Sequence, residues 1–74
     1  MSGFNPTDEH QYRGFRICLG ENYPGVWTAI VLRQSGADIV FQGKASDRWT
    51  TKDFYRPGDA LAEAQRFIDR GDLG

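Results

Sequence analysis

The chain has 74 residues, of which 39% are hydrophobic, 26% charged and 14% aromatic. A chain of this length buries only about 60–65% of its unfolded surface, which leaves little room for a catalytic cleft beside the core. The composition disfavours a disordered chain and is typical of one small soluble domain. The formal net charge of −1 argues against general nucleic-acid binding, because a domain that depends on phosphate contacts is normally basic.

Cysteine content and targeting signals narrow the class further. Cys18 is the single cysteine, which excludes an intramolecular disulfide and a cysteine-rich zinc site. The sequence contains no apolar run of about 18 residues, the length needed for a transmembrane helix. Residues 1–6 lack the basic and apolar stretches of a signal peptide. We therefore expect a cytoplasmic protein with no membrane partner.

The first half of the chain predicts a tail followed by two strands. Residues 1–10 show no hydrophobic period and predict a flexible N-terminal tail, which leaves residues 11–74 as a single small α+β domain. Alternating apolar residues after Tyr12 predict a first strand, and Pro24-Gly25 predicts a type II turn after it. Residues 26–33 are apolar on both faces, which is typical of a central strand.

The second half predicts a third strand, a fourth extended segment and a helix. Residues 39–41 are expected to form the third strand of a meander. Residues 48–55 favour an extended conformation, either a fourth strand or an arm along the sheet. An apolar stripe over residues 58–70 predicts the helix, with Gly71 as its stop. The stripe consists of Ala60, Leu61, Ala64, Phe67 and Ile68.

These elements predict an α+β fold, in which a three- to four-stranded antiparallel meander sheet carries one C-terminal helix on one face, in the order β-β-β-(β)-α. Side chains alternate between the two faces along each strand, so one set of apolar residues lies under the helix. A one-residue bulge would exchange the two faces. The expected core residues of the sheet are Phe15, Ile17, Leu19, Trp27, Ala29 and Val31.

Several short motifs resemble known proteins. The run Tyr12-Arg13-Gly14-Phe15, the run Trp27-Thr28-Ala29 and the Ala-rich helix ending in Ile68-Asp69 resemble small uncharacterised bacterial proteins over about residues 12–70. That resemblance implies a fold and no activity. The topology, with Tyr23-Pro24-Gly25, is also similar to HicB-type antitoxin domains, although Arg56-Pro57-Gly58-Asp59 replaces their Gly-Asp-Thr before the helix. This second resemblance implies a nucleic-acid-associated or antitoxin-like domain as an alternative function, although the sequence lacks the appended DNA-binding helices of such proteins.

The reactive side chains do not form a recognisable catalytic or metal site. Cys18 and His10 are the one thiol–imidazole combination, but His10 lies in the expected tail and Cys18 lies within a strand. A metal site needs three or four ligands at a suitable spacing, and none is present. We therefore expect no enzyme activity, no catalytic residues, no metal and no cofactor.

The second face of the sheet is the most informative feature for function. One helix covers one face, which leaves Ile30 and Leu32 on the other, unless the tail, a loop or the 48–55 arm covers them. Arg48 and Lys52 lie near Trp49 in the sequence, and they are either ordinary surface cations beside a structural tryptophan, which is the default interpretation, or a basic–aromatic patch for single-stranded nucleic acid. We predict an interaction surface that includes these five residues, in a non-enzymatic protein-binding or regulatory module that contacts a second copy or another protein. The alternative is a nucleic-acid-associated or antitoxin-like domain.

Overall fold

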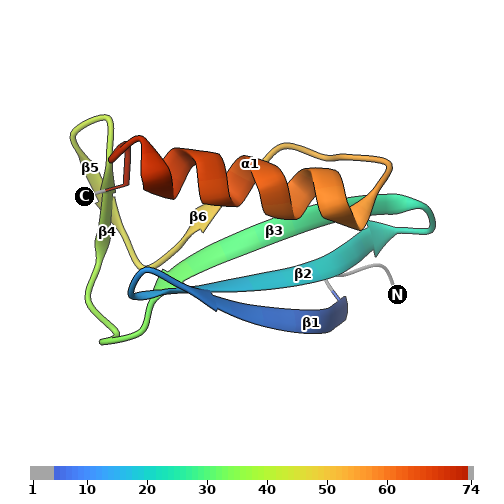
Figure 1. Cartoon of the computed structure of the whole chain (residues 1–74), viewed down its shortest axis with the longest axis horizontal. Helices are drawn as coiled ribbons and strands as arrows, with labels where there is room; N and C mark the ends of the chain where they lie inside the picture. The colour runs from blue at the N-terminus through green and yellow to red at the C-terminus, as the bar shows by residue number, and fades with distance from the viewer. Residues whose placement is uncertain (1–4, 74) are drawn as a thin grey trace.

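A computed structural model of the protein describes residues 5–73, and it describes their side chains from residue 8 onward. The chain forms a four-stranded antiparallel sheet in the order β1-β2-β3-β6, a separate two-stranded hairpin, β4-β5, and one helix across one face of the sheet (Figure 1). The predicted α+β architecture is thereby confirmed. The elements are β1 (Asn5–Tyr12), β2 (Phe15–Tyr23), β3 (Val26–Arg33), β4 (Ile39–Phe41), β5 (Lys44–Ser46), β6 (Trp49–Thr50) and α1 (Pro57–Asp69).

Tight turns build the meander from β1 to β3. Arg13 and Gly14 connect β1 to β2 with φ angles of 50° and 82°, and positive φ at both central residues is the mark of a type I′ hairpin turn. Pro24 and Gly25 connect β2 to β3, and the φ of 79° at Gly25 suits the third position of the expected type II turn. Both turns keep neighbouring strands in antiparallel register.

The N-terminal segment differs from the expected tail. Residues 5–12 form β1, which pairs with β2 along its length and places Glu9 opposite Cys18. Among its residues with described side chains, only Tyr12 has a large ring, so β1 has no apolar alternation and is stabilised by backbone hydrogen bonds. The Tyr12 hydroxyl also donates hydrogen bonds of 2.8 Å to the Asp69 carboxylate. The remainder of the expected tail, residues 1–4, lies outside the described residues.

The third strand of the meander also differs from the expectation. Residues 39–41 form β4, but β4 pairs with β5 across the Gln42-Gly43 turn and does not pair with β3. The place beside β3 belongs to β6, which pairs Thr50 with Ile30 and Trp49 with Val31. The chain then continues along β3 as far as a bridge between Phe54 and Trp27. The segment 48–55 is therefore a short fourth strand followed by an extended arm.

Small residues allow α1 to lie close to the sheet. Ala60 and Ala64 are fully buried against a strand surface whose central residues, Ile17 and Val31, are also fully buried. Five of the six predicted sheet core residues are buried, and Trp27 is half-buried. The sequence patterns did not include Ile39 and Leu73, which complete the core from the hairpin and from the segment after α1. The buried apolar set is Phe15, Ile17, Leu19, Ala29, Val31, Ile39, Ala60, Ala64, Ile68 and Leu73.

The ends of α1 follow the predicted signals. Pro57 occupies the first helical turn, where its missing N–H leaves no hydrogen bond unmade. Gly71 has a φ of 76°, its N–H donates to the Ile68 carbonyl, and the Asp72 N–H donates to the Phe67 carbonyl. This hydrogen-bond pair is a Schellman motif, which ends the helix. Within the described residues, no helix has both the length and the apolar character needed to cross a membrane.

Replacing Ile17 with alanine tests the position of the core. Ile17 is fully buried between the helix and the sheet, so Ile17→Ala should lower the free energy of unfolding by about 2–5 kcal/mol. The matched control is Ile30→Ala, because Ile30 is only half-buried and points to the other face. Urea unfolding at low protein concentration measures both values. Equal losses in the two variants would contradict the assignment of faces.

Candidate interaction surfaces

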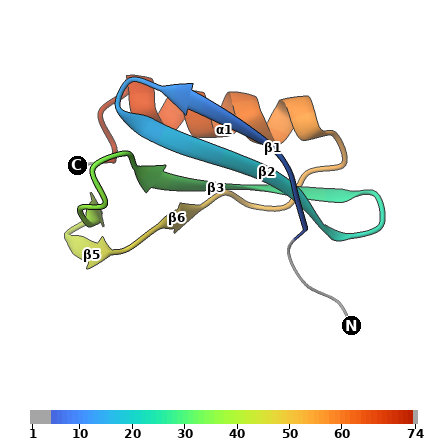
Figure 2. The same ribbon diagram turned by 90° about the horizontal axis from the view of Figure 1, so that it is seen from below.

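The face of the sheet opposite α1, here called the outer face, carries a row of apolar side chains. The register places Cys18 of β2 beside Ile30 of β3 and places Leu32 beside Arg16. Cys18, Ile30 and Leu32 are each half-buried. Figure 2 looks onto the outer face, with β1, β2 and β3 in front of α1. In the described part of the chain, no helix covers this row.

An ion pair borders the apolar row on the side of β1. The Arg16 guanidinium donates hydrogen bonds of 3.1 and 3.2 Å to the two Glu9 carboxylate oxygens. These hydrogen bonds, with the positive charge of Arg16, lower the pKa of Glu9 below its ordinary value. Burial raises the pKa of the neighbouring Cys18 thiol, and the Glu9 carboxylate adds to that rise. The outer face therefore presents a neutral thiol beside a pair of fixed, opposite charges.

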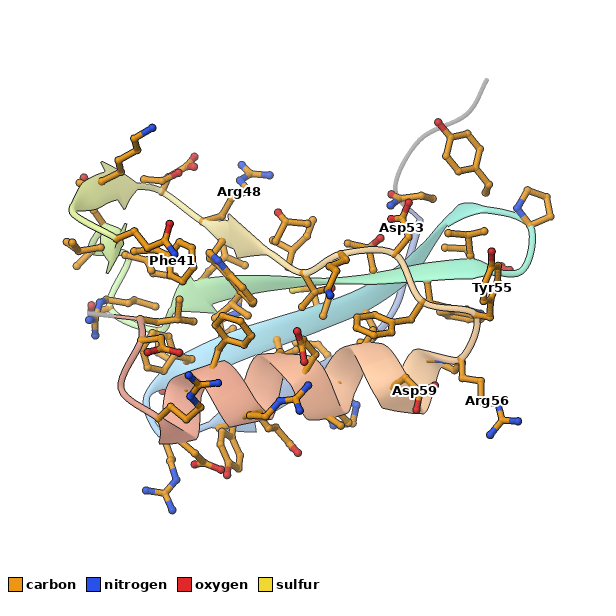
Figure 3. All side chains as sticks on the ribbon, turned by 90° about the horizontal axis from the view of Figure 1, so that it is seen from above. Phe41, Arg48, Asp53, Tyr55, Arg56 and Asp59 are labelled. Carbon is orange, nitrogen blue, oxygen red and sulfur yellow. The ribbon has the colours of Figure 1, made fainter. Side chains whose placement is uncertain are left out.

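A polar network covers the other end of the outer face. Thr28 lies on the same side of β3 as Ile30, yet it is only 2% exposed. Its hydroxyl donates a 3.0 Å hydrogen bond to Asp53, and it accepts a hydrogen bond from the Asn22 amide. The arm after β6, which carries Asp53 (Figure 3), is thus tied to Thr28. This hydrogen-bond network does not extend over Ile30 and Leu32.

The second candidate surface is a hollow between the β4-β5 hairpin and β6, with a volume of about 210 Å³. We call it the hairpin hollow. Ile39, Phe41 and Trp49 form its apolar part, and Gln42, Lys44, Ser46 and Arg48 supply its polar part. Phe41 and Arg48 lie at this end of the molecule in Figure 3.

An aromatic cluster holds the floor of the hairpin hollow in place. The ring centroids of Trp49 and Phe67 lie 4.7 Å apart, and that of Phe41 lies 5.7 Å from Trp49 and 5.9 Å from Phe67. These separations are typical of favourable aromatic pairs. Since Phe67 belongs to α1, the cluster joins the hairpin, β6 and the helix. The hollow is therefore formed by packed groups before any ligand binds.

The structure divides the five predicted surface residues among different places. Ile30 and Leu32 lie together on the outer face. Trp49 pairs with Val31, whose side chain points towards the helix, so Trp49 lies on the opposite side of the sheet. Arg48 lines the hairpin hollow beside Trp49, whereas Lys52 is exposed and does not line it. The predicted basic–aromatic patch therefore consists of Arg48 and Trp49, without Lys52.

Sequence reasoning did not bring Phe41 and Lys44 together at one surface. The two residues face each other across the Gln42-Gly43 turn, with φ angles of 52° and 80° in the turn. The available signal was Gly43, the second residue after the apolar strand, because a glycine at the second position of a two-residue turn favours a type I′ hairpin. Recognising that turn would have placed Lys44 opposite Phe41.

The candidate thiol–imidazole pair is separated by the sheet itself. Cys18 is paired with Glu9 on the outer face, whereas His10 is paired with Ile17, whose side chain points towards the helix. The His10 imidazole instead contacts the Asp8 carboxylate at 2.8 Å. The sheet therefore holds the thiol and the imidazole on opposite faces. Within the described residues, no three histidine, cysteine or acidic side chains gather as metal ligands do.

Comparisons with known proteins add no relative to this picture. Neither models of protein families, nor curated proteins, nor solved structures gave a match to the chain. A function must therefore be argued from the outer face and the hairpin hollow.

The reactivity of Cys18 tests the electrostatics of the outer face. Because its pKa is raised, native Cys18 should react with iodoacetamide at pH 7 more slowly than the same thiol in urea-unfolded protein. Glu9→Gln should lower the thiol pKa, since the neighbouring negative charge is removed. Asp8→Asn is the matched control, because Asp8 pairs with Leu19 on the helix side. Rapid alkylation of the native protein near pH 6 would contradict the assignment.

Proposed function

We propose that the protein is a non-enzymatic protein-binding module that acts through the outer face of its sheet, and that its partner there is a second copy of the chain. The observation that carries this proposal is the apolar row of Cys18, Ile30 and Leu32 on the face that α1 leaves uncovered. Apolar residues that lie together on an open sheet face are a typical element of a protein–protein interface. The proposal assigns this face to recognition and not to catalysis.

Charge supports a second copy as the partner. Glu9 and Arg16 border the apolar row and form a self-complementary pair of opposite charges. In a two-fold arrangement, the Arg16 of each copy can approach the Glu9 of the other without like-charge repulsion. Two sheets that pack face to face lie about 10 Å apart, so the dimer would have four layers in the order α-β-β-α.

The partial burial of the row predicts a weak association. Burying a fully exposed aliphatic side chain gains about 1.5–3 kcal/mol, and Ile30 and Leu32 have already lost most of their exposure. The gain that remains must offset about 4–15 kcal/mol of lost translational and rotational freedom. We therefore expect a weak association, which populates the dimer only at high protein concentration.

Association with nucleic acid is the second candidate function. It is favoured by Lys44 and Arg48, which line the hairpin hollow together with Trp49. Against it stand the net charge of −1 and the packing of the Trp49 ring against Phe41 and Phe67, which occupies the ring with intramolecular contacts. Protein binding is therefore the function that we prefer.

The variant Leu32→Glu tests the proposed interface. Two carboxylates brought together at a two-fold interface should abolish dimerisation while the fold, measured by circular dichroism, is kept. Light scattering coupled to size exclusion, from about 0.05 to 1 mM protein, measures the mass of wild type and variant.

The matched control is Val40→Glu. Val40 is 43% exposed on β4, which pairs with β5 and not with the strands of the outer face, so this variant should dimerise as the wild type does. A wild type that stays monomeric over the whole concentration range would overturn the proposal. Equal loss of association in both variants would also overturn it, because it would place the interface elsewhere.

A further inference from the structure

We infer that the hairpin hollow binds an acidic peptide segment, which inserts one large apolar side chain into the hollow against Phe41 and Trp49 and pairs its neighbouring carboxylates with Lys44 and Arg48. This inference goes beyond the proposed function, because it concerns a different surface and a different partner. Trp49 lies on the helix side of the sheet, and Ile30 and Leu32 lie on the outer side. Both surfaces can therefore be occupied at once.

The size of the hollow selects the kind of group that enters it. Its volume of about 210 Å³ is smaller than the ~300–1,000 Å³ that is usual for sites of cofactors and drug-sized ligands. A hollow of this size suits a single side chain. Because Ile39, Phe41 and Trp49 supply its apolar lining, the side chain that fits is a large apolar one.

The hollow is organised before binding, which lowers the cost of filling it. Ile39 is 1% exposed and anchors β4 in the core. Phe41 and Trp49 are each in contact distance of Phe67 on α1, so neither ring has to be ordered by the ligand. Groups that are already fixed lose little conformational freedom on binding.

The charges at the rim select an anion beside the apolar group. Lys44 forms no ion pair with any residue whose side chain is described, and Arg48 pairs only with its neighbour Asp47, at 3.4 Å and with both groups exposed. An exposed pair of this kind contributes little, so the guanidinium is available to a stronger partner. Arginine accepts a carboxylate in a bidentate geometry, and lysine acts as a compact positive charge.

Two observations favour a peptide over single-stranded nucleic acid. A nucleic acid presents a continuous row of phosphates, which a chain with a net charge of −1 repels beyond the two cations of the rim. Base stacking also needs an open ring face, and Trp49 is half-buried and packed against two other rings. A peptide needs only the one hollow and the two cations beside it.

The test uses three capped peptides, followed by ¹H–¹⁵N NMR on the full chain. The probe is acetyl-Gly-Glu-Leu-Glu-Gly-amide, and the matched peptides replace both Glu by Gln or the Leu by Ala. The Trp49 indole N–H should shift on titration. The Trp27 indole, which lies beside Phe54 at the other end of β3, should not. The probe should bind about three- to tenfold more tightly than the Gln peptide. It should bind at least about tenfold more tightly than the Ala peptide.

Variants of the protein complete the test. Changing Lys44→Gln and Arg48→Gln together should reduce the affinity for the probe to that for the Gln peptide. Lys52→Gln should not change it, because Lys52 is an exposed cation outside the hollow. The Leu32→Glu variant should bind the probe as the wild type does, which separates this inference from the proposed dimer. Equal affinities for the three peptides, or no shift at Trp49, would overturn the inference. Tighter binding of an oligothymidine at Trp49 would also overturn it, in favour of nucleic acid.

Discussion

The packing of a single helix against a sheet with two apolar faces determines the rest of this structure. Ala60 and Ala64 have no surface left in water, and α1 therefore approaches β2 and β3 closely over Ile17 and Val31. The hairpin and the residues after α1 complete the cover on that face through Ile39 and Leu73. All of the described large apolar groups that bury fully lie on this side, and the apolar residues of the outer face, Cys18, Ile30 and Leu32, are half-buried.

The elements that could be predicted from the sequence are those whose signals are local. Alternation in residues 15–19 and 26–33, the helical stripe and Gly71 each depend on neighbours a few residues away, and each is confirmed. The polar residues of β1 gave no such signal, because an exposed edge strand is stabilised by backbone hydrogen bonds to a partner far along the chain. The pairing of β4 failed for a similar reason, since an apolar run of three residues does not specify which strand it joins.

The same distinction explains how much of the candidate surfaces could be predicted. Ile30 and Leu32 were placed on the correct face because β3 is long and free of bulges, so its parity is preserved from Val26 to Arg33. Trp49 belongs to a strand of two residues, and its register depends on the length of the preceding hairpin. Arg48 and Lys52 look equivalent in the sequence. In the structure, Arg48 precedes β6 and lines the hairpin hollow, whereas Lys52 follows β6 and does not line it. No local pattern distinguishes these two cations.

The two surfaces differ in how firmly they are tied to the stability of the fold. The hairpin hollow shares Phe41 and Trp49 with the cluster that contacts Phe67, so its shape and the docking of α1 depend on the same rings. The outer face is formed by strands alone, and its apolar residues contact no helix. Evolution can therefore change the outer face with little loss of stability, whereas a change in the floor of the hollow also weakens the helix. The charged rim of the hollow is exempt from that constraint, since Lys44 and Arg48 are exposed. Substitutions at the rim can therefore change which partner binds at the hollow. Substitutions of the aromatic floor are constrained, because the same rings stabilise the fold.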